Sequence, residues 1–260
     1  MKRILIALAA LIACTAAMAA DEIKLLRSQS TVSAYYQVGL QSVRFEVLVK
    51  NIAYAKQVYV HLKKPDGSWI DVPLAYSRPA DSGREVWAGN FTDSNDAGPT
   101  YASWDLEFAL RYKVNGVEYW DNNGGQNYRQ AKDSGSLIPS APVLARFVDT
   151  GNPVTVYGNR YYGSVSVRNI GANRQVEIRY TTDGWQTTQT AWAVWNGDFW
   201  RSYYSSATNP NQYAVEEWAY GLSLPAGATR IEYAVGYTVN GQTYWDNNYG
   251  RNYVVRVQQQ

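Results

Sequence analysis

The sequence has one cysteine and one histidine among its 260 residues. Cys14 lies in the apolar N-terminal segment, so the chain after it has no disulfide, no thiol nucleophile and no cysteine metal site. His61 is the only imidazole. It alternates with Val60 and Leu62 in a period-two pattern, which places it on the polar side of a strand. We therefore expect His61 to be a surface residue rather than a catalytic one.

Long apolar runs are missing after the N-terminus, and no later segment is long and apolar enough to predict a membrane span. Residues 1–20 combine Lys2 and Arg3, an apolar run and a small-residue exit, which is typical of a signal peptide cleaved after residue 19 or 20. We expect a secreted or periplasmic protein. The alternative is a lipoprotein anchored at Cys14, because residues 11–14 resemble a lipoprotein box.

The chain also lacks an excess of charge of one sign. It has 24 Lys and Arg against 22 Asp and Glu, and removal of Lys2 and Arg3 with the signal peptide makes the numbers equal. Nucleic-acid binding depends mainly on excess positive charge, so we expect no nucleic-acid partner.

Tyrosine and tryptophan are abundant instead. There are 22 Tyr and 10 Trp against 5 Phe. Tyr and Trp combine an apolar ring with a polar group, which suits half-exposed surfaces and ligands that have both an apolar face and hydroxyl groups. Strands also favour these residues, so some of them are expected to be ordinary packing.

Two motifs occur twice in the same order. VKNIAYAKQV (residues 49–58) is repeated as VRNIGANRQV (residues 167–176), and YWDNNGGQNY (residues 119–128) is repeated as YWDNNYGRNY (residues 244–253). Two ordered matches indicate a tandem duplication.

The duplication predicts two domains after the signal peptide. We expect the first at residues 21–131 and the second at residues 143–260, referred to below as copy one and copy two. Residues 132–142 are rich in Ser, Gly and Pro, which predicts a flexible linker. The second copy is longer between its two motifs, in a region that contains several additional aromatic residues, namely Trp192, Trp195, Trp200, Tyr203 and Tyr204.

Apolar residues alternate with polar ones along residues 43–49, 58–62, 104–114 and 231–239. This period of two predicts half-buried strands, and no helical periodicity of comparable strength is present. Several short strands separated by turns in each copy predict an all-β protein made of two tandem immunoglobulin-like antiparallel β-sandwiches.

An Asn-Gly dipeptide before each YWDNN motif predicts a two-residue hairpin turn. Counting from that turn places Tyr119 on the core side of its strand and Trp120 on the solvent side. The same count places Tyr244 inside and Trp245 outside.

An outward Trp followed by an Asn-rich loop favours a sugar-binding surface. The indole offers apolar area to the C–H face of a pyranose ring, and asparagine amides offer hydrogen bonds to its hydroxyl groups. The alternative is that the Trp covers the sheet edge and the asparagines only shape the turn. Both features occur in both copies, which favours ligand binding.

These motifs resemble carbohydrate-binding module family 21, a starch-binding family that includes the glycogen-binding regions of phosphatase targeting subunits. Copy one carries the likeness in residues 49–58, in DGSW at residues 66–69 and in YKVNGVEYWDNNGGQNY at residues 112–128. The resemblance extends over both copies.

The resemblance implies an α-glucan site in each copy, made of two tryptophans and two loop asparagines. The implied residues are Trp69, Trp120, Asn122 and Asn127 in copy one, and Trp185, Trp245, Asn247 and Asn252 in copy two. The family pattern often has a third aromatic on the preceding strand, where this sequence has Ala109 and Ala234, so we expect a smaller platform.

A second family site would use Tyr54, Lys56 and Tyr76 of copy one. Copy two has Ala172 in place of Tyr54, so we expect this second site to be weak or absent there.

Catalysis and metal binding find little support. A glycosidase needs two carboxylates that flank a bond. The candidates Asp121 and Asp246 are expected on the core side of a turn, where capping of backbone amides is the common role. Residues 121–125 lack the spacing and the closing glutamate of a calcium loop. We therefore expect no catalytic residue, no metal and no cofactor.

The sequence thus predicts an exported, non-catalytic protein that binds α-1,4-glucans such as starch, glycogen and maltooligosaccharides through two modules acting with avidity. A separately encoded amylase is a candidate partner. Two alternatives stay open: an accessory part or relative of a secreted amylolytic enzyme with weak glycosidase activity, and a surface adhesin or scaffold protein.

Overall fold

The computed structural model describes all residues except 1–20, 36–37, 82, 96–102, 148–150 and 203–204. The predicted signal peptide and Cys14 therefore lie outside the described residues, as do Tyr203 and Tyr204. Strands are the only regular elements within the described ranges, and none of those ranges contains a helix able to cross a membrane.

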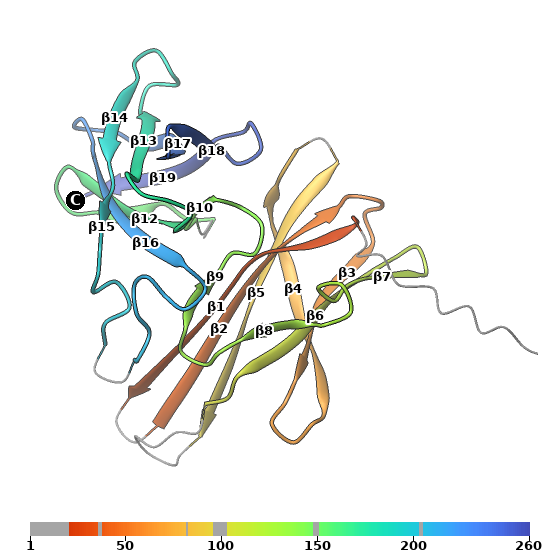
Figure 1. Cartoon of the computed structure of the whole chain (residues 1–260). Helices are drawn as coiled ribbons and strands as arrows, with labels where there is room; N and C mark the ends of the chain where they lie inside the picture. The colour runs from red at the N-terminus through yellow and green to blue at the C-terminus, as the bar shows by residue number, and fades with distance from the viewer. Residues whose placement is uncertain (1–20, 36–37, 82, 96–102, 148–150, 203–204) are drawn as a thin grey trace, which may run out of the picture.

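Copy one forms one strongly curled antiparallel sheet (Figure 1). Its strands are β1 (Ile23–Tyr35), β2 (Val38–Lys50), β3 (Lys56–Lys63), β4 (Trp69–Pro79), β5 (Arg84–Asn95), β6 (Leu106–Val114), β7 (Val117–Asp121) and β8 (Tyr128–Gln130). The order is β7-β6-β3-β4-β5-β2-β1, with β8 also on β6. Strand β4 pairs first with β3 and then with β5, and its bulge between Tyr76 and Arg78 helps the sheet to curl around one core.

Copy two has two sheets around a separate core. Its strands are β10 (Val143–Ala145), β11 (Val154–Val156), β12 (Arg160–Arg168), β13 (Gln175–Thr181), β14 (Gln189–Trp192), β15 (Val194–Trp195), β16 (Val215–Ser223), β17 (Arg230–Val239), β18 (Gln242–Asp246) and β19 (Tyr253–Gln259). One sheet has the order β10-β12-β16-β15 and the other β11-β19-β17-β13-β14, with β18 on β17. All pairs are antiparallel except β11 with β19. The prediction of an all-β, sandwich-like fold is confirmed.

The predicted hairpin register is also confirmed. Trp120 lies opposite Arg111, and Trp245 lies opposite Gly236. Both Asn-Gly pairs adopt positive φ, as a two-residue turn of this type requires. Tyr119 and Tyr244 pack against the cores of their copies, but each is only half-buried.

The prediction of a flexible linker at residues 132–142 is wrong. Strand β9 (Gly135–Leu137) lies within this segment and pairs with β1, which extends the copy-one sheet toward copy two (Figure 1). Ser136 is fully buried, and its hydroxyl donates a 2.7 Å hydrogen bond to Glu217. Serine hydroxyls thus bond to distant partners here, which composition alone does not reveal.

The two copies share a buried junction on either side of this segment. An apolar cluster joins them, formed by Leu26, Leu48, Ala80, Val86, Ile138, Leu144 and Val215. Buried Arg27 of copy one donates to the carbonyl oxygens of Leu144 (2.9 Å) and Ala145 (3.0 Å) in copy two. The copies are therefore held against each other rather than tethered.

Candidate functional site

The copy-one platform has three rings, of which sequence reasoning identified two. The imidazole of His61 on β3 stacks on Trp69 at 4.8 Å between ring centroids and 8° between ring planes. It also meets Trp120 edge-on at 5.4 Å. His61 lies opposite Ala109 in the strand register. The structure therefore brings the two predicted tryptophans together through His61, which was interpreted only as a surface residue.

Charged groups hold this platform in place. Asp71 accepts an ion pair from Arg111, and its Oδ1 atom lies 2.8 Å from Nδ1 of His61. The Arg111 guanidinium in turn lies 5.5 Å from the Trp120 ring centroid. Asp71 thus bonds to His61 and to Arg111, two residues that contact Trp120.

Asn127 belongs to the same surface. Its Nδ2 atom donates a 2.9 Å hydrogen bond to Glu107, whose other carboxylate oxygen pairs with Lys63 at 3.2 Å. The Asn127 hydrogen bond is the main reason why the pKa of Glu107 lies below its usual value, ahead of the opposing effect of burial. Lys63 lies 5.9 Å from the Trp69 ring, so these residues connect Asn127 to the platform.

Asn122 mainly shapes the loop. Its Oδ1 atom accepts from Gly125 N at 2.9 Å, and its carbonyl oxygen accepts from Asn127 N at 2.8 Å. Asn247 closes the copy-two loop in the same way, with Gly250 and Asn252 as donors. The sequence alternative, that these asparagines shape the turn, is therefore part of their role.

The copy-two site uses different residues around its tryptophans. Trp245 is 43% exposed, and the Arg179 guanidinium lies 4.6 Å from its ring centroid. Trp185 follows the Asp-Gly turn with a φ of 70°, and its Nε1 atom donates to Glu232 at 3.0 Å. The two rings are anchored through different residues, whereas the copy-one rings share His61.

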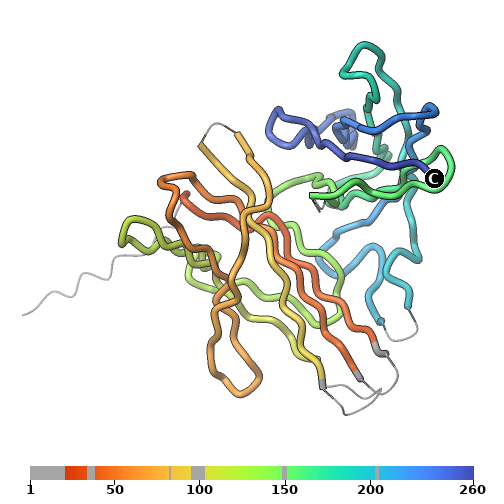
Figure 2. The backbone as a smooth tube through the Cα atoms, turned by 180° about the vertical axis from the view of Figure 1, so that it is seen from behind, coloured from red at the N-terminus to blue at the C-terminus, as the bar shows by residue number. Residues whose placement is uncertain are grey.

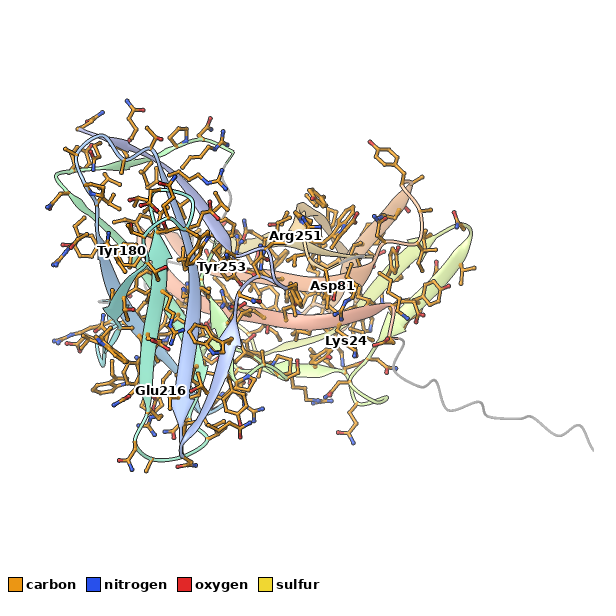
Figure 3. All side chains as sticks on the ribbon, turned by 90° about the horizontal axis from the view of Figure 1, so that it is seen from above. Lys24, Asp81, Tyr180, Glu216, Arg251 and Tyr253 are labelled. Carbon is orange, nitrogen blue, oxygen red and sulfur yellow. The ribbon has the colours of Figure 1, made fainter. Side chains whose placement is uncertain are left out.

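The copy-two loop also contacts copy one. Arg78 of copy one donates to Oδ1 of Asn248 at 3.0 Å, and Arg251 of copy two donates to the carbonyl oxygen of Ala80 at 2.7 Å. Figure 3 shows Arg251 close to Asp81, at the copy-one turn that Ala80 begins. Copy one therefore fixes the orientation of the loop that carries Asn247 and Asn252.

Of the three residues predicted for the second site, Tyr54 and Tyr76 are exposed and Lys56 is not. Tyr54 is fully exposed, and Tyr76 is 54% exposed and meets Trp87 edge-on at 6.4 Å. The Lys56 side chain is only 3% exposed and pairs with Glu85 at 2.8 Å. Lys56 is thus an internal ion-pair partner as the structure stands, and Trp87 is a neighbour that sequence reasoning missed.

Copy two has an ion pair and a tryptophan hydrogen bond that match those of the second site in copy one. Arg174 pairs with Glu216 at 3.3 Å, and Glu216 accepts from Nε1 of Trp218 at 3.1 Å, as Glu85 does from Trp87. Trp195 lies opposite Trp218 in the register, where copy one has Tyr76, and it is 46% exposed. Copy two thus lacks a ring at the Tyr54 position but has one at the Tyr76 position.

The aspartates of the two YWDNN motifs serve the fold. Buried Asp121 accepts from the Tyr128 hydroxyl at 2.7 Å, and Asp246 accepts from the Tyr253 hydroxyl at 2.9 Å and from Ala145 N at 2.7 Å. Burial raises the pKa of Asp246, against the effect of these donors. Across the described parts of the chain, no group of three or more His, Cys, Asp or Glu side chains is arranged to hold a metal ion.

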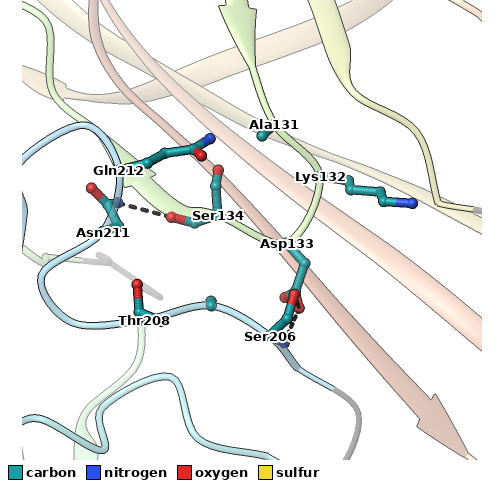
Figure 4. Close-up of a pocket in the computed structure, with 9 residues that line it drawn as sticks. Ala131, Lys132, Asp133, Ser134, Ser206, Thr208, Asn211 and Gln212 are labelled. Atoms are coloured by element: carbon teal, nitrogen blue, oxygen red, sulfur yellow. Dashed lines mark hydrogen bonds between the residues drawn. The ribbon is translucent and has the colours of Figure 1, made fainter.

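A polar pocket at the junction is distinct from these platforms (Figure 4). Its lining consists of residues 131–134, 206–208 and 211–212 and contains no aromatic ring. Asp133 accepts from Val32 N at 2.9 Å and from the Ser206 hydroxyl at 3.0 Å, and Asn211 donates to the Ser134 carbonyl oxygen at 2.8 Å. These groups bond to one another and join the two copies.

Comparison with known proteins agrees with the paired platforms. The sequence matches the carbohydrate/starch-binding module family 21 over residues 27–131 and again over residues 154–256. The chain belongs to this family. Both family-21 segments contain the tryptophans and the loop asparagines described above, so each copy carries its own candidate carbohydrate site.

The chain is also similar to two longer proteins, in each case over about the length of one such segment. Glycogen-binding subunit 76A of Drosophila melanogaster is 36% identical over 91 residues, which cover 35% of this chain and 12% of that protein. Protein phosphatase 1 regulatory subunit 3B of Bos taurus is 32% identical over 102 residues, covering 38% of this chain and 32% of that protein. The chain thus spans a third or less of the length of these relatives.

One solved structure that resembles the chain is the starch-binding domain of Rhizopus oryzae glucoamylase in complex with β-cyclodextrin and maltoheptaose. It is 22% identical, with a TM-score of 0.30, and the match covers 44% of this chain and 97% of that domain.

Proposed function

We propose that the protein binds α-1,4-glucans, such as starch, glycogen and maltooligosaccharides, through one surface on each copy. The observation that carries this proposal is that Trp120 and Trp245 occupy the same register position on the outer face of their sheets, next to a closed asparagine loop. An indole on the outer face of a sheet, beside amide and carboxylate groups, matches a sugar ring, which has an apolar C–H face and a hydroxyl rim.

The surfaces act together on one polymer, because both copies belong to one body. The copy-one hairpin of β6 and β7 lies at the end of the molecule away from copy two, whereas the copy-two loop lies at the junction (Figures 1 and 2). A long glucan that reaches both surfaces gains from the high effective concentration of the second site. Since the junction fixes the spacing, this gain requires a polymer that can follow the surface between the sites.

We propose a binding role without catalysis. The support is that Asp121 and Asp246 are both occupied by tyrosine hydroxyls and backbone amides of their own copy. Residues 1–20 support export, to the periplasm or the medium, and an amylase encoded elsewhere would then be a natural neighbour on the same polymer.

The proposal is tested by retention of the exported chain on insoluble starch and on glycogen–agarose, with cellulose as the control. We expect retention on both α-glucans but not on cellulose, and loss of retention when Trp69, Trp120, Trp185 and Trp245 are all replaced by Ala. Equal retention on cellulose, or unchanged retention of the fourfold variant, would disprove the proposed sites. Release of reducing sugar that Asp246→Asn abolishes would instead show an enzyme.

A further inference from the structure

The outer face of copy two carries a third exposed tryptophan that the family resemblance does not assign. Trp192 on β14 lies opposite Glu177 on β13. Glu177 lies opposite Gly236 on β17, and Gly236 lies opposite Trp245 on β18. Its neighbour Ala191 packs against the core, so Trp192 points outward. Trp192 is 59% exposed. One row across four strands therefore begins and ends with an exposed indole.

Two residues lie between these indoles in the row, Gly236 and Glu177. A Cβ atom on Gly236 would lie 3.0 Å from the Trp245 ring and 2.9 Å from Cγ of Glu177, so only glycine allows the ring to lie this close to the sheet. Arg179 donates to Glu177 at 3.1 Å and also covers Trp245. The planar Glu177–Arg179 pair can offer both acceptors and donors to sugar hydroxyl groups.

Copy one differs in this row. Its residues are Pro73 on β4, Tyr59 on β3, Arg111 on β6 and Trp120 on β7. Pro73 stands where copy two has Trp192, and Arg111 lies over both Tyr59 and Trp120, at 5.1 and 5.5 Å from their ring centroids. The row with a tryptophan at each end is therefore a property of copy two.

We propose that Trp192 forms an additional subsite of copy two, which binds the same α-glucan chain beyond Trp245. Three strand spacings separate the two ends of the row, about 14 Å, so the ligand must be several sugar units long to contact both indoles. The inference rests on the proposed function.

The test uses the full chain, because the copies share a buried junction. Trp69→Ala and Trp120→Ala together remove the copy-one platform, and Trp192→Ala is then added. Calorimetric titration with maltoheptaose and maltotriose measures the change. We expect the affinity for maltoheptaose to fall about tenfold, which corresponds to about 1.4 kcal/mol, and the affinity for maltotriose to stay within about twofold.

Three further variants make the result decisive. Trp192→Tyr should retain most of the maltoheptaose affinity. Tyr157→Ala, at an exposed tyrosine on another part of copy two, should not change the affinity for either ligand. Trp245→Ala should weaken both ligands. If Trp245→Ala weakens binding but Trp192→Ala has no effect, or an equal effect on both ligands, the additional subsite is refuted and the proposed function stands. If neither variant changes binding, both are refuted.

Discussion

Replacement of Glu46 by Gln is expected to destabilise the whole molecule, because Glu46 neutralises two buried arginines beside the junction. The Glu46 side chain is 1% exposed, and its carboxylate lies 3.5 Å from Arg27 and 4.0 Å from Arg78. Arg27 holds the backbone of Leu144 and Ala145, and Arg78 holds Asn248. Glu46→Gln keeps the shape of the side chain but leaves both guanidinium groups without their buried counter-charge.

The expected cost is about 3–5 kcal/mol of unfolding free energy, as for other buried ion pairs that lose one partner. The cost should depend on pH. Burial alone would raise the pKa of Glu46, but Arg27, Arg78 and Arg44 outweigh it and hold the pKa below the ordinary 4.5. A carboxyl group with a lowered pKa stabilises the fold above its ordinary value and loses this contribution as the pH falls through the folded pKa. The difference between the wild type and Glu46→Gln should therefore be largest above pH 4.5 and shrink on acidification below it.

Urea unfolding followed by tryptophan fluorescence and by circular dichroism, at several pH values, measures this difference. The matched control is Glu118→Gln in copy one, which removes a partner of Lys113 from an ion pair that is 42% exposed at Glu118. Because solvent screens this exposed pair, its loss should change the stability little. A Glu46→Gln variant no less stable than the control, or equally destabilised at every pH, would refute the reasoning.

The other predictions concern the platforms and the junction. Trp120→Ala should weaken α-glucan binding and shift the melting temperature little, whereas Tyr112→Ala, at a fully buried ring, should cost about 3–5 kcal/mol; binding and thermal melts compare the two. His61→Ala should weaken maltoheptaose binding by copy one, measured with Trp185→Ala and Trp245→Ala as background, and His61→Phe should restore it. Leu144→Ala should cost about 2–5 kcal/mol and increase amide exchange in β1 as well as in β10, because its cluster joins both copies. Exchange that increased in β10 alone would contradict a shared junction.

Local patterns in the sequence determined the elements that carry the platforms. A two-residue turn fixes the register of the strands on both sides of it, so the outward direction of Trp120 and Trp245 follows from counting. The alternation of apolar and polar residues predicted the all-β class in the same way, because the apolar positions of each strand mark its buried face. The repeated motifs predicted two domains, and the family model matches the chain in two segments.

Tertiary structure alone decided how the elements meet. His61 belongs to the platform because β3 lies between β4 and β6, and Trp192 aligns with Trp245 because β13 and β17 lie between their strands. Lys56 proved to be an ion-pair partner because the chain brings Glu85 to it. These relations depend on strand order, which a period-two pattern does not encode.

The junction shows the same limit most clearly. Residues 132–142 have the composition of a linker, and Arg27 and Glu46 lie in strands whose pattern says only which side chains point inward. Burial of Arg27 becomes favourable only when partners more than 100 residues away, the carbonyl oxygens of Leu144 and Ala145, supply hydrogen bonds that water would otherwise provide. A sequence shows which side chains are polar, but the fold determines whether a distant group forms hydrogen bonds with them. Because such bonds form across the junction, the two repeats make one body.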